Sequence, residues 1–135
     1  MASPTLARRA DCDYGPVALS VLVVDDDATF RCIIARALVD WGHVVIGEAG
    51  SVEEALVRAA ELRPDTALVD IGLPDGDGFA LTRQLCAMPS SPRVVLISTD
   101  PDASSGPAAS RAGAIGFLAK DVLSRETFGQ LVEGR

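Results

Sequence analysis

Residues 67–79 read ALVDIGLPDGDGF. Three apolar residues run directly into Asp70, and the segment behind it holds Pro74, Gly76 and Gly78, which favour a turn over regular structure. The pattern predicts a buried strand that ends at a carboxylate and passes into a turn-rich loop. A lone aspartate after a strand is usually a turn residue. Asp70 becomes a candidate for the functional site because ligands and reactive groups gather at the carboxyl edge of an open α/β sheet.

A second apolar run also ends in carboxylates. Val21–Val24 is followed by three aspartates, Asp25, Asp26 and Asp27. In a parallel sheet these acids would lie at the same edge as Asp70. Two unit charges about 4 Å apart repel each other by roughly 4 kcal/mol at an effective dielectric constant of about 20, so such a cluster needs protons or a cation. Oxygen ligands without His or Cys nearby indicate Mg²⁺.

The rest of the chain alternates between short apolar runs, which predict strands, and apolar residues repeated every three or four positions, which predict helices. The predicted strands are 20–24, 44–49, 66–69, 93–98 and 116–119. The predicted helices begin after the cap residues Asp27, Ser51 and Ser124, near Phe79 and near Ala108. Five strands alternating with five helices imply right-handed βαβ units and a parallel sheet with helices on both faces, which is the α/β class.

Local patterns predict how some of these elements begin and pack. A helical stripe of apolar residues is predicted to face the core; its members are Phe30, Ile33, Ile34, Ala37, Leu38 and Trp41. Ser51 with Glu54 predicts a capping box. His43 is predicted to face solvent in a turn. Segment 99–107 is rich in Asp, Ser, Pro and Gly, so little regular helix is expected before Pro107.

Length and composition limit the class of protein. With 135 residues, of which 48% are hydrophobic, the chain suits one folded domain and is not wholly disordered. Residues 1–19 lack periodicity and are expected to form a flexible tail, which leaves 20–135 as the domain. No apolar run approaches the ~20 residues of a membrane span, and no secretory signal is recognised. A soluble, cytoplasmic protein without membrane contact is expected.

Charge and reactive residues exclude several function classes. The net charge is −7 and the basic residues are scattered, which argues against nucleic-acid binding by this domain alone. Three cysteines without Cys-x-x-Cys spacing predict no disulfide framework and fit a reducing cytoplasm. A histidine-rich zinc site is excluded because the chain has one histidine.

Four motifs stand at the ends of predicted strands. They are Asp25-Asp26 after the first strand, Asp70 with Pro74 and Gly78, Ser98 after the apolar run 94–97, and Lys120 after residues 116–119. In this order they resemble the receiver domain of two-component response regulators, and the resemblance extends from Ser20 to about Glu133. Each motif alone is common, but their order and their placement at strand ends are together specific.

The resemblance implies a fold and a reaction. The fold is a flavodoxin-like, doubly wound sheet of five parallel strands in the order 2-1-3-4-5, with the ends of strands one, three, four and five around one pocket. Asp70 would accept a phosphoryl group from a phosphohistidine of a partner sensor histidine kinase and become an aspartyl phosphate. Such a domain is a self-phosphorylating switch and not an enzyme, with autodephosphorylation left open.

The resemblance also implies a magnesium site. By the family pattern, Mg²⁺ is bound directly by Asp26 and Asp70, by the backbone carbonyl of Gly72, and by Asp25 mostly through water. Lys120 would supply a further positive charge to the phosphoryl group. It is the only lysine among twelve basic residues. Its compact ammonium suits a point contact with one phosphoryl oxygen better than the broad arginine fork does.

Two further residues are assigned to the switch by the resemblance. Ser98 would bond the phosphoryl group and draw its loop inward, and Phe117 matches the family's switch aromatic residue. The altered surface would comprise the fourth helix, the fifth strand and the fifth helix. The expected partners are a sensor histidine kinase and an output domain or downstream protein, and a homodimer is left open.

Two alternative functions compete with this interpretation. Residues 25–29, DDDAT, fit the Asp-x-Asp-x-Thr motif of aspartate-nucleophile phosphatases of the haloacid dehalogenase type, with Asp25 as the nucleophile. Ser98 and Lys120 would then take the place of later motifs, but that family needs a further acidic motif after its lysine and a longer chain. The other alternative is a phosphorylation-independent adaptor with the same fold, which the complete acidic site argues against.

Overall fold

The computed structural model describes residues 18–102 and 104–133. Five parallel strands form the main sheet in the order β2-β1-β3-β6-β7. These strands are β1 Ser20–Val24, β2 Val44–Ala49, β3 Thr66–Asp70, β6 Arg93–Ser98 and β7 Gly116–Ala119. All five predicted strands are confirmed, and their order is the predicted 2-1-3-4-5 arrangement.

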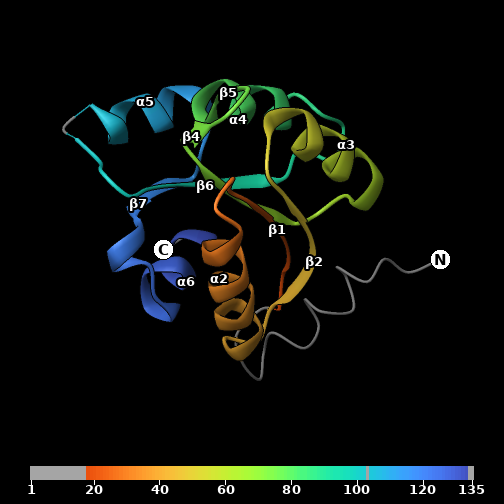
Figure 1. The fold of residues 1–135 in the computed structure, drawn as a ribbon, viewed down its shortest axis with the longest axis vertical. Coiled ribbons are helices and arrows are strands. Elements are labelled where there is room, and N and C mark those ends of the chain that lie inside the picture. The colour runs from red at the N-terminus through yellow and green to blue at the C-terminus, as the bar shows by residue number, and fades with distance from the viewer. Residues whose placement is uncertain (1–17, 103, 134–135) are drawn as a thin grey trace.

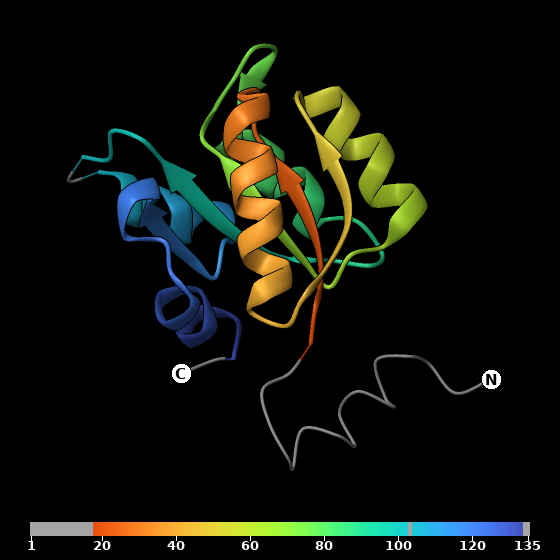
Figure 2. The ribbon, with the colours of Figure 1, turned by 60° about the horizontal axis from the view of Figure 1, so that its bottom comes forward.

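Helices cover both faces of this sheet (Figure 1). They are α2 Ala28–Asp40, α3 Val52–Leu62, α4 Gly78–Cys86, α5 Ser105–Ala112 and α6 Arg125–Val132. Helices α2 and α6 lie on one face, and α3, α4 and α5 lie on the other. Figure 2 turns the face of α2 and α6 toward the viewer. The predicted α/β class with a doubly wound sheet is therefore confirmed.

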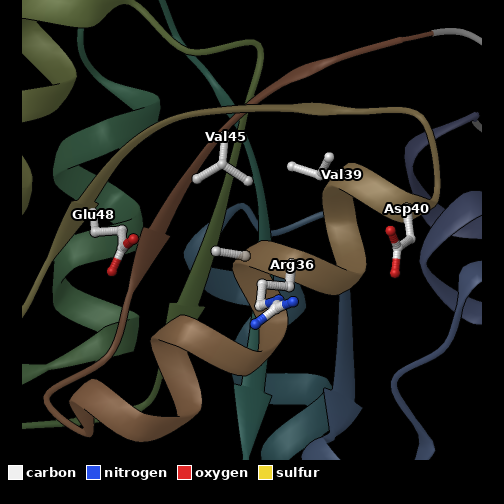
Figure 3. A pocket seen from close by; sticks show the side chains of 6 residues that line it. Arg36, Val39, Asp40, Val45 and Glu48 are labelled. Atoms are coloured by element: carbon white, nitrogen blue, oxygen red, sulfur yellow. The ribbon is translucent and has the colours of Figure 1, made fainter.

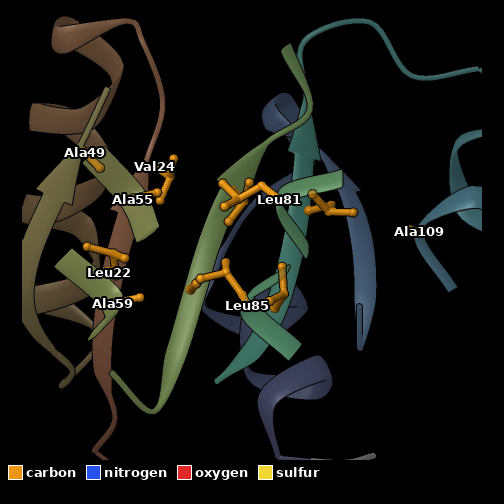
Figure 4. Close-up of a cluster of buried hydrophobic side chains, with 12 residues drawn as sticks. Leu22, Val24, Ala49, Ala55, Ala59, Leu81, Leu85 and Ala109 are labelled. Carbon is orange, nitrogen blue, oxygen red and sulfur yellow. The ribbon is translucent and has the colours of Figure 1, made fainter. Parts of the chain in front are cut away.

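Two hydrophobic clusters fill the space between the sheet and its helices. Side chains alternate along a strand, so Leu22 and Val24 of β1 join the cluster under α3, α4 and α5 (Figure 4). Val21 and Val23 join the other cluster, under α2 and α6. All four are fully buried. A central parallel strand that is covered on both faces needs apolar residues at every position, which explains the continuous apolar run in the sequence.

Helix α2 begins as predicted but buries a narrower face than expected. Asp27 Oδ1 accepts hydrogen bonds from two backbone N–H groups of the first turn. Only Ile34 and Leu38 of this helix are buried. Ile33 is 61% exposed, so the prediction that it faces the core is wrong. The stripe is wider than the area that the sheet and α6 cover, and residues at its edge stay exposed.

The start of α3 is capped by groups from two places in the chain. Ser51 Oγ accepts a hydrogen bond from the N–H of Glu54, as a capping box requires. The Glu54 carboxylate, however, accepts the N–H of Gly50 and not that of Ser51, so the predicted box is only half formed. Asp75, in the loop after β3, accepts two further N–H groups of the first turn at 2.7 and 3.1 Å. This contact ties the loop behind Asp70 to α3.

Helix α5 starts earlier than the composition indicates. Its first residue is Ser105, two to three positions before the predicted start near Pro107 or Ala108. The Asp102 carboxylate accepts hydrogen bonds from the hydroxyl groups of Ser104 and Ser105 and from the N–H of Ser104. Serine and aspartate, which disfavour a helix interior, here order the segment that leads into the helix.

Two short elements are not predicted by the sequence. They are an antiparallel hairpin, β4 Gly72–Leu73 with β5 Gly76–Asp77, and a 3-10 turn, η2 Lys120–Val122. The hairpin follows Asp70 after one residue, and η2 begins at the end of β7. Both therefore belong to the edge of the sheet where the candidate residues lie.

The predicted tail, residues 1–19, lies outside the described residues except for Ala18 and Leu19. Leu19 is buried in the cluster under α2 and α6, and its carbonyl oxygen accepts a hydrogen bond from Val44. Cys32 and Cys86 are free thiols, and Cys12 lies outside the described residues. Among the helices of the described segments, none has the length and apolar character that crossing a membrane requires.

His43 connects the start of β1 to α6, and the prediction that it faces solvent is wrong. Its Nδ1 accepts a hydrogen bond from the N–H of Leu19 at 3.2 Å. Its ring meets the Phe128 ring edge to face, with the centroids 5.3 Å apart. Burial lowers the pKa of His43; Glu133 opposes this effect and Arg125 adds to it.

We expect His43 to reduce the free energy of unfolding in mildly acidic solution. The folded pKa lies below the ordinary value of 6.5, so the unfolded chain binds the proton more tightly. The contribution is present above that value and is lost as the pH falls through the folded pKa. In His43→Asn, Oδ1 can still accept the Leu19 N–H but nothing titrates. Urea unfolding at about pH 7.5 and about pH 5 should show a smaller loss of stability in the variant. Equal losses would contradict this expectation.

Candidate functional site

The ends of four strands bring candidate residues to one edge of the sheet. Asp25 follows β1, Asp70 ends β3, Ser98 ends β6 and Lys120 follows β7. The parallel register of β1, β3, β6 and β7 keeps these strand ends level. Residues that are up to 95 positions apart therefore share one edge because the strands are parallel.

Three carboxylates gather at this edge. Asp25, Asp26 and Asp70 each offer an oxygen atom, and these oxygens lie within 4.8 Å of one another. Asp25 has no exposed surface, Asp26 is exposed and Asp70 is 9% exposed. Burial raises the pKa of Asp70, as do the charges of Asp25 and Asp26, whereas Lys120 and a backbone hydrogen bond from Gly72 oppose the rise. A bound cation would offset the repulsion among these carboxylates, and a set of oxygen donors fits Mg²⁺.

The Lys120 ammonium lies against this cluster. Its Nζ is 2.6 Å from Asp25 Oδ2 and 3.8 Å from Asp70 Oδ2. It also lies 4.2 Å from the centroid of the Phe30 ring. Among the described residues, Asp25 Oδ2 accepts no regular hydrogen bond, so the ion pair with Lys120 is what offsets its burial.

The other residues that the resemblance assigns to the site have different surroundings. Ser98 is buried, and its Oγ accepts the N–H of Asp100 at 3.1 Å, which leaves the hydroxyl proton able to donate elsewhere. Phe117 packs against the core cluster under α3, α4 and α5. Gly72 is exposed in β4, and its backbone donates a hydrogen bond to the Asp70 carboxylate. The role of its carbonyl as a metal ligand stays a prediction.

Gly78 lets α4 begin directly against Asp70. Its N–H donates to the Ile71 carbonyl at 2.8 Å. A Cβ at this position would lie 2.6 Å from the Asp70 carbonyl oxygen and 2.7 Å from Ile71 Cα, closer than real Cβ atoms approach. A Cβ at Gly72 would meet nothing within 4 Å. The close approach of two backbones therefore explains the glycine at 78.

Two neighbours of the acidic cluster were not identified as such from the sequence. The Arg31 guanidinium donates to the carbonyl oxygen of Asp25 and pairs with Glu48 at 3.2 Å. Phe30, predicted as a core residue, packs at the edge of the cluster under α2 and α6 and also lies beneath Lys120. The sequence did hold a signal for their place near the site. Both residues lie in the first turn of α2, directly after the acidic run, and this turn starts at the same edge of the sheet.

A separate hollow lies between α2 and β2 (Figure 3). It is lined by Ala35, Arg36, Val39, Asp40, Val45 and Glu48. None of the clustered carboxylates contributes to it, and neither does Lys120. The reactive groups are therefore at the strand ends and not in this hollow.

Comparisons with known proteins agree with this geometry. The family model described as "Response regulator receiver domain" matches residues 21–132. The DNA-binding transcriptional activator DevR/DosR of Mycobacterium tuberculosis is 36% identical over 113 residues, covering 80% of this chain and 50% of that protein. The response regulator GacA of Pseudomonas viridiflava is 37% identical over 103 residues, covering 76% of this chain and 48% of that protein. The chain thus spans about half the length of the curated relatives it matches.

Solved structures show the same fold. The signal receiver domain of the putative response regulator NarL from Mycobacterium tuberculosis superposes with a TM-score of 0.78 at 32% identity, covering 87% of this chain and 98% of that one. A CheX–CheY–BeF3–Mg complex from Borrelia burgdorferi contains a chain that superposes with a TM-score of 0.77 at 25% identity, covering 90% of this chain and 91% of that one.

Replacing Gly78 tests whether the contact with Asp70 is as tight as the structure shows. Gly78→Ala should lower the free energy of unfolding by about 1–3 kcal/mol, because backbone atoms must move to admit the methyl group. Gly72→Ala, in the same loop with open space around it, should change it by less than about 0.5 kcal/mol. Urea unfolding measures both. Similar effects of the two substitutions would argue against the close approach at Gly78.

Proposed function

The chain belongs to the response regulator receiver family, and on this basis we propose that Asp70 is the residue that accepts the phosphoryl group. Receiver domains of this family are phosphoacceptor switches in two-component signalling. The observation that carries the assignment to Asp70 is its place at the end of β3. There Lys120 Nζ lies 3.8 Å from its Oδ2, and Asp25 and Asp26 complete the acidic cluster.

In the proposed reaction, a carboxylate oxygen of Asp70 attacks the phosphorus of a phosphohistidine on a partner kinase. An O–P bond forms as the P–N bond breaks, and the leaving imidazole nitrogen keeps the electron pair. Asp70 must be ionised to attack. Burial raises its pKa, and the nearby Lys120 opposes that rise, so the lysine favours the reactive form. The same ammonium can then compensate the negative charge on the phosphoryl oxygens.

Receiver domains bind Mg²⁺ at an acidic pocket, and the proposed ligands here are Asp26, Asp70 and the Gly72 carbonyl, with Asp25 acting through water. When bound, the ion offsets charge on the phosphoryl oxygens. Two observations support this division of roles. Asp26 is the exposed member of the cluster and is open to an entering ion, whereas Asp25 Oδ2 is already engaged by Lys120.

The proposed route of the signal runs from Ser98 into α5. Ser98 Oγ accepts the N–H of Asp100, and Asp102 bonds the serines that lead into α5. If the Ser98 hydroxyl donates to a phosphoryl group on Asp70, this hydrogen-bonded loop is drawn with it. Phe117 lies on β7, the strand that pairs with β6, and is the proposed second switch residue. The altered surface would then comprise α5, β7 and α6.

The proposed partners follow from the family of the chain and from the length of its curated relatives. The curated relatives are about twice as long, and one of them is a DNA-binding transcriptional activator. An output domain or a downstream protein is therefore the proposed recipient of the signal. A sensor histidine kinase is the proposed donor, and the cytoplasm is the proposed location of the chain itself. A net charge of −7 disfavours nucleic-acid binding by the chain alone.

The phosphatase alternative has less support. It requires Asp25 to be the nucleophile, but Asp25 is fully buried and its Oδ2 is held by Lys120. Asp27, the second acid of that motif, caps α2. The adaptor alternative would leave the acidic cluster and its lysine without a role.

Replacing Asp70 tests the phosphoacceptor assignment. After treatment with acetyl phosphate and Mg²⁺, intact-mass measurement should show one phosphoryl adduct on the wild type and none on Asp70→Ala. Asp25→Ala should form the adduct more slowly because metal binding is weakened. Asp77→Ser, which can keep the cap of α4, is a control in the same loop and should still be modified. An adduct on Asp70→Ala would refute the assignment, and one mapped to Asp25 would favour the phosphatase.

Magnesium should stabilise the fold, because the ion binds a carboxylate cluster that exists only in the native state. With free Mg²⁺ at about ten times Kd, the free energy of unfolding should rise by about 1.4 kcal/mol. Melting curves should show a Tm increase that Asp26→Ala abolishes. Asp40→Ala, at the other end of α2, should retain the increase. The metal assignment fails if the wild type shows no shift or if Asp26→Ala shifts equally.

A further inference from the structure

The Lys120 ammonium also contacts a group that carries no charge. Its Nζ lies 4.2 Å from the centroid of the Phe30 ring, which belongs to the first turn of α2. The same nitrogen contacts the carboxylates of Asp25 and Asp70 at 2.6 and 3.8 Å. The ammonium is thus held between two carboxylates and one aromatic face. A ring face attracts a cation through its quadrupole, most strongly where water is scarce, and the Lys120 side chain is only 15% exposed.

The position of Phe30 is fixed on two sides. Its backbone N–H donates to the Asp27 cap at 3.3 Å. Its side chain packs at the edge of the cluster that contains the buried Ile34, one turn further along α2. A ring that is restrained in this way provides a fixed surface for a flexible lysine side chain.

We propose that Phe30 is a positioning residue for Lys120. The Phe30 ring keeps the Lys120 ammonium beside Asp70 when the carboxylates bind a divalent cation. In the structure, Asp25 is the nearest partner of Nζ. A divalent cation in the cluster would compensate this carboxylate and repel the ammonium. The attraction between the ring and the ammonium does not depend on the charge of the carboxylates. It therefore persists when a bound cation offsets that charge.

An aromatic side chain suits this task better than its alternatives. A carboxylate at position 30 would hold Lys120 more strongly, but it would compete for the metal and repel phosphoryl oxygens. An aliphatic side chain would let the ammonium turn toward water. The ring holds the lysine weakly enough to release it to a phosphoryl oxygen on Asp70. This last step rests on the proposed function, whereas the position of Lys120 on the ring does not.

The single lysine of the chain makes the contact measurable. The 135-residue chain labelled with ¹³C-lysine gives one set of lysine side-chain signals. Protons above a ring face resonate upfield, so the ε-methylene protons of Lys120 should lie upfield of their position in free lysine, both without and with MgCl₂. Phe30→Leu should remove the shift, and Phe30→Tyr should retain it. An unshifted wild-type signal, or a shift that disappears when Mg²⁺ binds, would overturn the proposal.

Phosphorylation kinetics separate positioning from packing. With acetyl phosphate and saturating Mg²⁺, Phe30→Leu should lower the maximal rate about two- to fivefold, the factor that a cation–π contact at a partly exposed site supplies. The Kd for Mg²⁺ should not rise, because the ring supplies no ligand to the ion. In a Lys120→Met background, Phe30→Leu should have no further effect; an equal decrease in both backgrounds would show that Phe30 only packs. If the wild type is not phosphorylated, the proposed function fails, and the lysine signals still decide the place of Lys120.

Discussion

Lys120 Nζ lies 2.6 Å from Oδ2 of Asp25, a carboxylate with no exposed surface, and the arrangement of the site depends on this ion pair. Two neighbouring strands end in acids, and burial together with Asp25 raises the pKa of Asp70. Without a cation, such a cluster would favour protonation or a separation of the strand ends. One ammonium only partly compensates three carboxylates. The remaining negative charge is what makes this edge suited to a metal ion and a phosphoryl group.

Much of the fold could be predicted because each strand is a short apolar run with a clear end. The strands β1 and β3 are covered on both faces, so the first polar residue after each apolar run lies at the end of the strand or directly after it. That rule places Asp25 and Asp70 at one edge before any contact is known. It also places Ser98 and Lys120 there, while the roles of Gly72 and of the switch residues came only from the resemblance.

The features that the sequence did not reveal depend on contacts between separate elements. Apolar spacing puts Phe30 and Ile33 in one helical stripe, but it does not tell how far the neighbouring elements cover the edges of that stripe. The start of α5 depends on the Asp102 carboxylate, whose bonds to nearby serines outweigh a composition that disfavours helix. The cap that Asp75 provides for Val52 joins residues 23 positions apart, which no local pattern can show.

A single turn at the start of α2 connects the backbone of the acidic run to the charges around it. Asp27 caps the helix, Phe30 lies under Lys120, and Arg31 bonds to the carbonyl oxygen of Asp25. Because these side chains belong to one turn, the orientation of the helix start sets the positions of Lys120 and Asp25 together. The strand ends determine where the carboxylates lie, and the start of α2 determines how the positively charged side chains of Lys120 and Arg31 are held around them. A change that rotated this turn would leave the five strands intact and still separate Lys120 from its ring. Part of the control over the site therefore belongs to a helix whose apolar pattern predicts only a core element.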